Sequence, residues 1–281
     1  MSNISLKLND QQIEKLKQTF KEDIKPNSNE YIDTFINNDN VTISIYKSGK
    51  VVFQGKDALF YGSAFIETKV NDQAGSDEVG TGDFFGPVCV CATIVDKEQF
   101  PLLEKLGVTD SKQLDDKKIC EIAPILMKEI KHSLLILEDK QYNSVHERYN
   151  LNAIKAKLHN KAYINMIKKG YAIPKAAYVD QFAPENLYYS YLKDEKEIYH
   201  ELIFETKAES KYPAVAAASV IARYAFIEKM KEMENKYHTS FHKGAGEDVD
   251  KDMVKYIQKY GKERLNEVAK LHFANYKKID N

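Results

Sequence analysis

The sequence of 281 residues is short of cysteine and has no long apolar run, and each shortage excludes a class of protein. The three cysteines, Cys89, Cys91 and Cys120, are an odd number without CxxC spacing, which favours a reducing cytoplasm over a disulfide scaffold. No stretch approaches the roughly 18 consecutive apolar residues that a membrane-spanning helix needs. The N-terminal residues also lack the charged and then apolar layout of a signal peptide. We therefore expect a cytoplasmic protein that does not enter a membrane.

An excess of charge of one sign is missing as well. The net charge is −1, so the sequence has no overall basic character of the kind that marks many nucleic-acid binders. Any such surface must come from local segregation of charge. The chain is 43% hydrophobic and 30% charged, which is enough apolar material for a core. Its length suits one large domain or two ordinary ones.

Residues 1–68 predict a small α+β domain. Apolar residues recur at helical spacing over residues 9–24, after which the pattern breaks. Residues 41–54 alternate and contain a KSGK turn, which predicts a hairpin with one buried face and one polar face. The expected apolar face carries Val41, Ile43 and Ile45, and the expected polar face carries Thr42, Ser44 and Tyr46. A helix-like stretch and a linker follow, so we expect a second domain over residues 69–281.

The second part intermixes strand and helix patterns, which indicates an α/β fold with helices on the faces of a sheet. The predicted strands are 74–78, 87–95, 132–138, 176–180 and 200–205, and the predicted helices are 97–106, 115–130, 151–169, 185–194, 213–236 and 248–261. The helix at 151–169 carries many lysines, among them Lys155 and Lys157, and His159. We interpret its lysines as a solvated face.

Two adjacent acids, Asp77 and Glu78, stand directly before the apolar run of the second predicted strand. Burying a carboxylate is costly unless something compensates its charge. Successive residues of a regular strand point to opposite faces, so both acids cannot line one site from an ideal strand. Gly80 and Gly82 relax this restriction, and a strand that ends or bulges at Glu78 would bring both carboxylates to one edge.

Two further acids occupy positions that suit the same edge. Asp180 closes an apolar run, and functional residues of α/β sheets gather at the carboxyl ends of strands. Glu209 precedes a helix whose first turns are rich in alanine, so that helix can press closely against a sheet. Taken alone, Asp180 is equally a turn residue and Glu209 an acid favoured by a helix N-terminus. Together with Asp77 and Glu78 they form an oxygen-ligand set that suits Mg²⁺ or Mn²⁺.

Five sequence blocks carry a resemblance. The first, GSDEVGTGDFFGPVCVCA, resembles the first signature of the type 2 ribonuclease H family, and its Gly-Asp-x-Phe-Gly-Pro form is similar to the ribonuclease HIII branch. TDSKQL, YVDQF, AESKYPAVAAASVIAR and FHKGAG resemble the later blocks, in family order, so that the likeness spans residues 74–246. The N-terminal helix and hairpin also fit that branch, whose extra domain is similar to half of a TATA-box-binding protein. The implied fold is a ribonuclease H-like mixed sheet flanked by helices, preceded by this small α+β domain.

The resemblance also implies roles for particular residues. Asp77, Glu78, Asp180 and Glu209 would be the catalytic, metal-binding acids, with Glu228 the weaker candidate for the fourth position. The backbone of Gly80, Thr81 and Gly82 would contact the RNA strand near a 2′-hydroxyl, and Ser111 and Lys112 would hold a phosphate. On the N-terminal hairpin we expect Tyr46, Lys47 and Lys50 to contact nucleic acid.

The implied activity is endonucleolytic hydrolysis of the RNA strand of RNA/DNA hybrids. Two Mg²⁺ or Mn²⁺ ions would take part, leaving 5′-phosphate and 3′-hydroxyl ends. We expect a monomer without an obligate protein partner. Two alternatives stay open: cutting at single embedded ribonucleotides, as in ribonuclease HII, and hybrid binding without catalysis. Thr81 disfavours the first, because ribonuclease HII has arginine there, and four filled acidic positions disfavour the second. The glycine spacing of GTGDFFG is wrong for a dinucleotide-binding protein.

Overall fold

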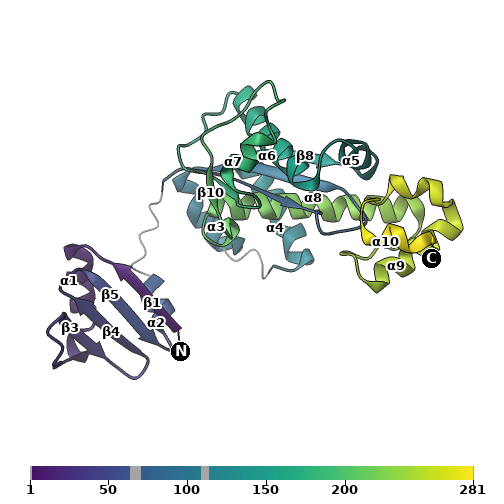
Figure 1. Ribbon diagram of the computed structural model, residues 1–281. Helices are drawn as coiled ribbons and strands as arrows, with labels where there is room; N and C mark the ends of the chain where they lie inside the picture. Colours follow the sequence, from purple (N-terminus) through teal and green to yellow (C-terminus); the bar gives the residue numbers. More distant parts are fainter. Residues whose placement is uncertain (1, 64–70, 109–113, 281) are drawn as a thin grey trace. The chain divides into compact units, whose positions relative to one another are not determined.

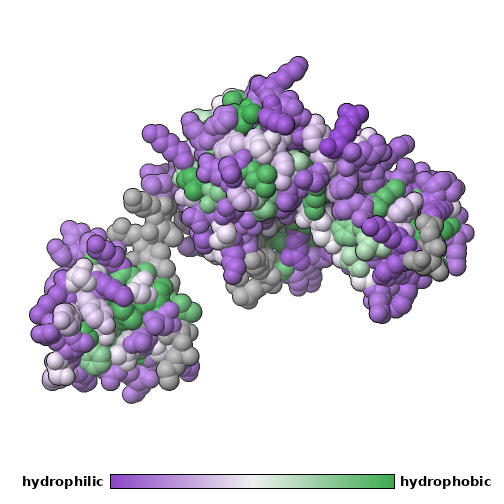
Figure 2. Space-filling view, in the orientation of Figure 1, coloured by the Kyte–Doolittle hydropathy of each residue, from purple (hydrophilic) through white to green (hydrophobic). Residues whose placement is uncertain are grey.

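The computed structural model describes residues 2–63, 71–108 and 114–280. The chain divides into two compact units, Met1–Val70 and Asn71–Asn281, each with its own hydrophobic core (Figure 1). The domain boundary predicted after residue 68 lies outside the described residues. The surface visible in Figure 2 is mostly hydrophilic, with small separate hydrophobic patches.

The first unit is an antiparallel sheet of five strands in the order β1-β5-β4-β3-β2. Its elements are β1 (Ser2–Lys7), α1 (Asp10–Thr19), a 3₁₀ turn (Lys21–Asp23), β2 (Ile24–Lys25), β3 (Ile32–Asn37), β4 (Val41–Tyr46), β5 (Lys50–Gly55) and α2 (Ala58–Ser63). The predicted hairpin is confirmed as β4 and β5. The helix predicted over 9–24 ends earlier, at Thr19, because the chain then pairs as β2 with β3.

The two faces of this sheet differ. Val41, Ile43 and Ile45 are buried, as predicted, in a core that also contains Leu16 of α1 and Ala58 of α2. The opposite face carries Thr42, Ser44 and Tyr46. The neighbouring strands add Asn37 and Gln54 to it, and also Phe35 and Val52, which pair with Ser44 from either side and leave it buried. The described helices of this unit therefore cover one face of the sheet and leave uncovered the other, where polar and apolar side chains mix.

The second unit is built on a mixed sheet in the order β10-β9-β6-β7-β8, with β9 and β10 parallel to β6 and the other pairs antiparallel. Its strands are β6 (Gln73–Val79), β7 (Val88–Val95), β8 (Lys131–Leu137), β9 (Ala177–Asp180) and β10 (Ile203–Glu205). Its α-helices are α3 (Phe100–Leu106), α4 (Asp116–Glu129), α5 (Asp139–His146), α6 (Leu151–Lys168), α7 (Glu185–Ser190), α8 (Pro213–Tyr237), α9 (Glu247–Tyr260) and α10 (Ala274–Lys277). The 3₁₀ segments are η2 (Lys97–Gln99), η4 (Ala208–Ser210), η5 (Lys262–Glu267) and η6 (Lys278–Asp280).

Helices cover both faces of this second sheet (Figure 1). Helix α8 packs closely on β6, since a side chain at Gly75 would meet the backbone of Val215 at 2.4 Å. The small residues at the start of α8 that the sequence singled out are buried there: Ala214, Ala216, Ala217 and Ala218. On the other face α6 reaches the sheet, because its His159 side chain contacts Ser76. Of the helices in the described ranges, none combines the length and the apolarity needed to cross a membrane.

Candidate active site

The four predicted acids lie around one pocket of about 400 Å³ at the ends of β6 and β9. Its lining consists of Asp77, Glu78, Ile119, Asp180, Glu209, Ser219, Val220 and Arg223. Three separate segments, β6, β9 and η4, contribute the carboxylates. Glu228 does not line this pocket; its carboxylate is 41% exposed and pairs with Lys231 at 2.8 Å.

Strand β6 brings two adjacent acids to this pocket. The sequence suggested that the strand ends or bulges at Glu78, but β6 stays paired with β7 in regular register through Val79. The pairing of β6 with β9 stops at Ser76 and Val179, so the edge of β6 is open where the acids follow. Because the side chains reach past this open edge, Asp77 from the α8 face and Glu78 from the α6 face both line the pocket.

Asp77 and Asp180 come next to each other where β6 and β9 part. Oδ1 of Asp77 accepts the amide of Glu78 at 2.8 Å, and the Ser219 hydroxyl also bonds to the carboxylate. Enclosure by protein, followed by the charge of Glu78, raises the pKa of Asp77 well above its usual range. Oδ1 of Asp180 accepts the amide of Ala208 at 3.0 Å, which ties η4, and with it Glu209, to the end of β9.

Glu78 is held by two residues of α6 that sequence reasoning did not assign to the site. Lys155 Nζ forms an ion pair with Oε1, and His159 Nε2 lies 2.9 Å from Oε2. Burial by itself would raise the pKa of Glu78, but the bond to His159 and the charge of Lys155 bring it below its ordinary value. The interpretation of the α6 lysines as a solvated face was thus wrong for Lys155, which is 8% exposed. The spacing of Lys155 and His159, one helical turn apart, is the signal that could have paired them.

The pocket suits divalent cations by its donor chemistry. In the described ranges, no three Asp, Glu, His or Cys side chains stand close enough together to hold a metal ion as they are. Even so, the pocket gathers four carboxylates, and enclosure, followed by the charge of Glu78, raises the pKa of Asp77. Oxygen donors in this number fit Mg²⁺ or Mn²⁺, whose charge would relieve the repulsion.

The loop after β6 holds the predicted RNA contacts. Gly80 has φ +94°, and a side chain there would meet the carbonyl oxygen of Pro87 at 2.1 Å, so only glycine fits. Thr81 is half-buried and Gly82 is exposed. The loop thus makes a tight turn and presents its backbone next to Glu78.

Two distant segments fix this loop. Asp83 accepts the amide of Gly244 at 2.6 Å, and Phe84 donates to the Gly244 carbonyl at 2.8 Å, so the FHKGAG block serves as a backbone support. Lys270, which is fully buried, donates to the carbonyls of Asp83 and Gly86. Sequence reasoning missed Lys270, because no local pattern marks a lysine that hydrogen-bonds to a distant loop.

Arg223 is a further pocket residue that sequence reasoning missed. Its guanidinium donates to Asp116 Oδ1 and to the carbonyl of Leu114, each at 2.7 Å. Lys243 pairs with the same Asp116 carboxylate. Cationic groups therefore gather beside the acidic pocket. Ser111 and Lys112 lie outside the described residues.

In the first unit, the predicted contact residues lie at the β4–β5 hairpin. Tyr46 is half-buried on the polar face, and Lys47 and Lys50 are exposed at the turn. Gly49 adopts φ +80°, which lets the turn close. All three side chains are thus accessible to a ligand of this unit.

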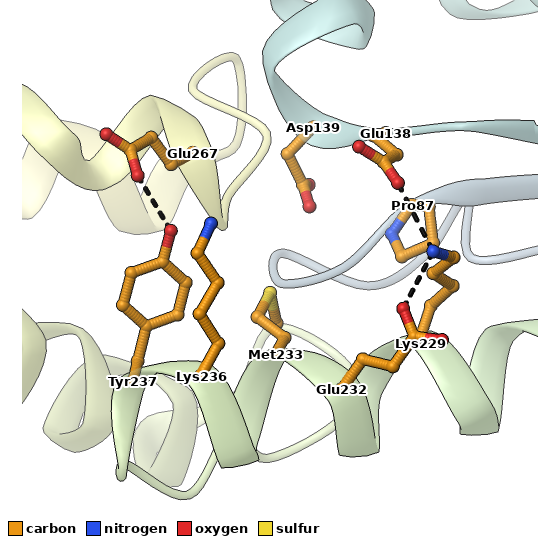
Figure 3. A pocket seen from close by; sticks show the side chains of 9 residues that line it. All are labelled: Pro87, Glu138, Asp139, Lys229, Glu232, Met233, Lys236, Tyr237 and Glu267. Carbon is orange, nitrogen blue, oxygen red and sulfur yellow. Dashed lines mark hydrogen bonds and ion pairs between the residues drawn. The ribbon is translucent and has the colours of Figure 1, made fainter.

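A second pocket, of about 200 Å³, lies between α8, the start of α5 and η5 (Figure 3). Its charged residues are largely paired with each other: Lys229 with Glu138 and Glu232, and the Tyr237 hydroxyl with Glu267. It contains none of the predicted site residues. The acid-lined pocket is therefore the candidate active site.

Comparison with known proteins identifies the family. The model of the Ribonuclease HII family matches residues 74–276, and that of a domain of unknown function (DUF3378) matches residues 3–77. The chain is 41% identical over 305 residues to Ribonuclease HIII of Bacillus cereus strain AH187, covering 99% of this chain and 98% of that protein. The chain belongs to the ribonuclease HIII family.

Solved structures agree with this assignment. The crystal structure of Bst-RNase HIII in complex with Mn²⁺ matches with a TM-score of 0.76 and 34% identity, covering 99% of this chain and 97% of that one. Aquifex aeolicus RNase H3 shares the fold, with a TM-score of 0.58 and 24% identity over 96% of this chain and 99% of that one. The chain is therefore a ribonuclease H, an endonuclease that hydrolyses the RNA strand of RNA/DNA hybrids.

Proposed function

We propose that this chain cleaves the RNA strand at the acid-lined pocket, with Asp77, Glu78, Asp180 and Glu209 holding divalent cations. The observation that carries the proposal is the convergence of four carboxylates from three segments on one pocket. Four carboxylates brought this close together repel one another, and bound divalent cations would offset that repulsion. Two bound Mg²⁺ or Mn²⁺ ions would activate a water molecule and stabilise the leaving 3′-oxygen.

The positions of Asp77 and Asp180 suggest their role in binding a cation. Asp77 and Asp180, side by side where β6 and β9 part, are the natural pair to share an ion. Ser219 and the Glu78 amide orient Asp77, and the Ala208 amide orients Asp180. These hydrogen bonds fix the orientation of Asp77 and Asp180, while the acids of the pocket would still have to draw together to hold a cation.

The loop at Gly80, Thr81 and Gly82 is proposed to read the RNA strand. Its tight turn at Gly80, which has positive φ, directly follows Glu78 in the chain, and Gly82 adds backbone that is exposed. A ribose 2′-hydroxyl both donates and accepts a hydrogen bond, so backbone groups alone can distinguish RNA from DNA. Ser111 and Lys112 complete the proposal as phosphate ligands.

The N-terminal unit is proposed to grip the hybrid through the polar face of its sheet. In the described residues this face has no helix over it, and Lys47 and Lys50 are exposed at its hairpin. Tyr46 would contact sugar or base, and the lysines phosphates. We expect the chain to act as a monomer, without an obligate protein partner.

A cleavage assay on two substrates tests the activity. We expect metal-dependent cutting of a long RNA/DNA hybrid, complete loss with excess chelator, and poor cutting of a duplex that contains one ribonucleotide. Similar rates on both substrates would restore the ribonuclease HII-like alternative. Binding of hybrid without any cleavage would favour the non-catalytic alternative.

Paired variants test the fourth acid. Glu209→Gln should abolish cleavage because Glu209 lines the pocket, and Glu228→Gln should keep it because Glu228 faces Lys231 outside the pocket. An inactive Glu228→Gln together with an active Glu209→Gln would show that the assignment of the fourth acid is wrong.

A further inference from the structure

Both carboxylate oxygens of Glu78 are engaged from the far side of the sheet. Lys155 Nζ contacts Oε1, and His159 Nε2 stands 2.9 Å from Oε2. Lys155 is 8% exposed and His159 is fully buried. Neither side chain lines the acidic pocket, so both act on it only through Glu78.

His159 is oriented by a second contact. Its Nδ1 lies 2.8 Å from the hydroxyl of Ser76, which shares the α6 face of β6 with Glu78. When Ser76 donates to Nδ1, the ring hydrogen is on Nε2 and points at Glu78. One tautomer therefore satisfies both contacts, and it directs a donor to the carboxylate.

The ring of Phe182 also contacts Lys155. Its ammonium lies 3.9 Å from the centroid of the Phe182 ring, and this ring also faces His159 at 5.6 Å between centroids. Phe182 follows Asp180 by two residues. The contact thus links the lysine that holds Glu78 to the segment that carries another pocket acid.

Stability is a weak reason for this arrangement. Apolar residues of similar volume are often as stable as a buried ion pair, or more so, because the charges must be desolvated. Lys157, two residues along the same helix, shows the ordinary alternative: it pairs with Asp194 and Glu195, whose side chains are 44% and 37% exposed. The pair at Lys155 and His159 is instead buried against one acid of the candidate site.

We propose that Lys155 and His159 are positioning residues that hold the Glu78 carboxylate in the orientation in which it binds a divalent ion. This inference rests on the proposed role of Glu78 in the pocket. Partners of metal-binding carboxylates typically change metal affinity or activity by about 10- to 100-fold when they are removed. The effect should travel through Glu78 and leave the grip on the hybrid unchanged.

Mn²⁺ binding to the full chain, measured by titration calorimetry, tests the proposal alongside hybrid cleavage. Lys155→Met and His159→Phe remove the contacts at similar volume, and each should weaken Mn²⁺ binding about 10- to 100-fold. In both variants kcat should fall while KM for the hybrid stays within about threefold, because substrate contacts are intact. His159→Gln, whose amide can still donate to Glu78, should recover part of the loss. Lys157→Met is the matched control and should behave as the unaltered chain.

A double variant separates positioning from general damage. Glu78→Gln combined with Lys155→Met should bind Mn²⁺ no more weakly than Glu78→Gln alone, because the path through Glu78 is already broken. Further weakening in the double variant would contradict the proposal. So would unaltered Mn²⁺ affinity and kcat in Lys155→Met and His159→Phe.

Three further outcomes are decisive. If Lys155→Met does not fold, Lys155→Gln removes the charge with a polar side chain, and an unaltered kcat and Mn²⁺ affinity there would overturn the proposal. If Glu78→Gln cleaves hybrid at the full rate, the proposed function of Glu78 fails, and the inference with it. If Glu78→Gln is inactive while the α6 variants are unaffected, only the inference fails.

Discussion

The two sheets of the molecule differ in how their faces are covered. The first unit places its described helices on one face and leaves the other without a described helix, with Thr42 and Tyr46 on it beside Phe35 and Val52. The second unit covers both faces, with α8 on one side and α6 on the other. A half-covered sheet offers a surface for contacts, whereas a fully covered sheet can enclose charges such as Asp77 and Lys270. The first unit can therefore act through contacts at its uncovered face. The second unit can act through charged groups that it encloses.

The largest effect is expected from removing one enclosed charge. Asp77→Asn should lower hybrid cleavage at saturating Mg²⁺ by at least about 1000-fold, on the scale seen when a catalytic group is lost. The amide keeps the shape but binds a divalent ion weakly. Single-turnover cleavage measures the loss, and activity above a few per cent would remove Asp77 from the site.

The thermal stability of Asp77→Asn in metal-free buffer provides the control. A carboxyl group whose pKa is raised on folding contributes stability below its unfolded-state pKa and loses it as pH rises toward the folded-state value. The pKa of Asp77 is raised by enclosure and by Glu78. Asp77→Asn should therefore melt higher than the unaltered chain at pH 7, with little difference near pH 3. A lower melting temperature at pH 7 would mean that the fall in activity reports a damaged fold.

Replacing Lys270 tests how much stability is lost when one partner of a buried ion pair in the second unit is removed. Its ammonium is fully buried, supports the loop carbonyls and lies 3.9 Å from Asp139, which is 3% exposed. Burial raises the pKa of Asp139 to about 7 despite the lysine. Lys270→Met should lower the free energy of unfolding by about 3–5 kcal/mol, the usual penalty for breaking a buried pair.

Urea titration measures this loss of stability. The matched control in the same titration is Lys278→Met. Lys278 pairs with Asp250 but is 56% exposed, so its removal should cost less than about 1 kcal/mol. Equal losses of stability in the two variants would show that enclosure does not set the strength of these pairs.

Deleting the first unit tests the contact surface. A chain that begins at Asn71 keeps all four acids and its own core, and should bind hybrid about 10- to 100-fold more weakly, or roughly 1.4–2.7 kcal/mol. The slope of log K against log salt should become shallower by about 0.9 for each phosphate that the deleted unit would have neutralised. Filter binding across a salt series measures both. An unchanged affinity at every salt concentration would show that this unit is not a substrate grip.

The smallest effect is expected at a half-buried ion pair of the second unit. Glu267 accepts bonds from Arg264 and Tyr237, which lower its pKa to about 2. A lowered carboxyl pKa gives stability above the unfolded-state value that disappears as pH falls through the folded-state value. Glu267→Gln should therefore cost about 1 kcal/mol at pH 7, after screening by solvent, and almost nothing near pH 2. Thermal melts at the two pH values check this, and a loss of stability at pH 2 equal to that at pH 7 would contradict it.

Much of the fold could be predicted from the sequence because the periodicity of apolar residues is a local signal. The strand predicted at 87–95 differs from β7 by one residue at one end, and the strand predicted at 132–138 differs from β8 by one residue at each end. Helix α5 was missed, since only Tyr142 and Asp139 are buried in its eight residues and the apolar stripe is thin. Strand β1 was missed too, because its pairing partner is β5, which is distant in sequence.

The sequence by itself determined which residue types meet at the pocket. The acids at 77, 78, 180 and 209 follow or precede strong local patterns, and the structure places all four around one pocket. The role of Gly80 could also be predicted, because a turn that needs positive φ favours glycine over other residues.

Only the tertiary structure decided what surrounds those acids. Strand alternation turns Asp77 toward α8 and Glu78 toward α6, but the packing of α6 on the sheet decides that Lys155 and His159 meet Glu78. Lys155 and Lys157 look alike in sequence, yet one pairs with Glu78, whose side chain is 11% exposed, and the other pairs with Asp194, whose side chain is 44% exposed. The physical reason is that side-chain periodicity fixes which face of a helix a residue occupies, whereas the strands and helices packed against that face fix its partners and its dielectric surroundings.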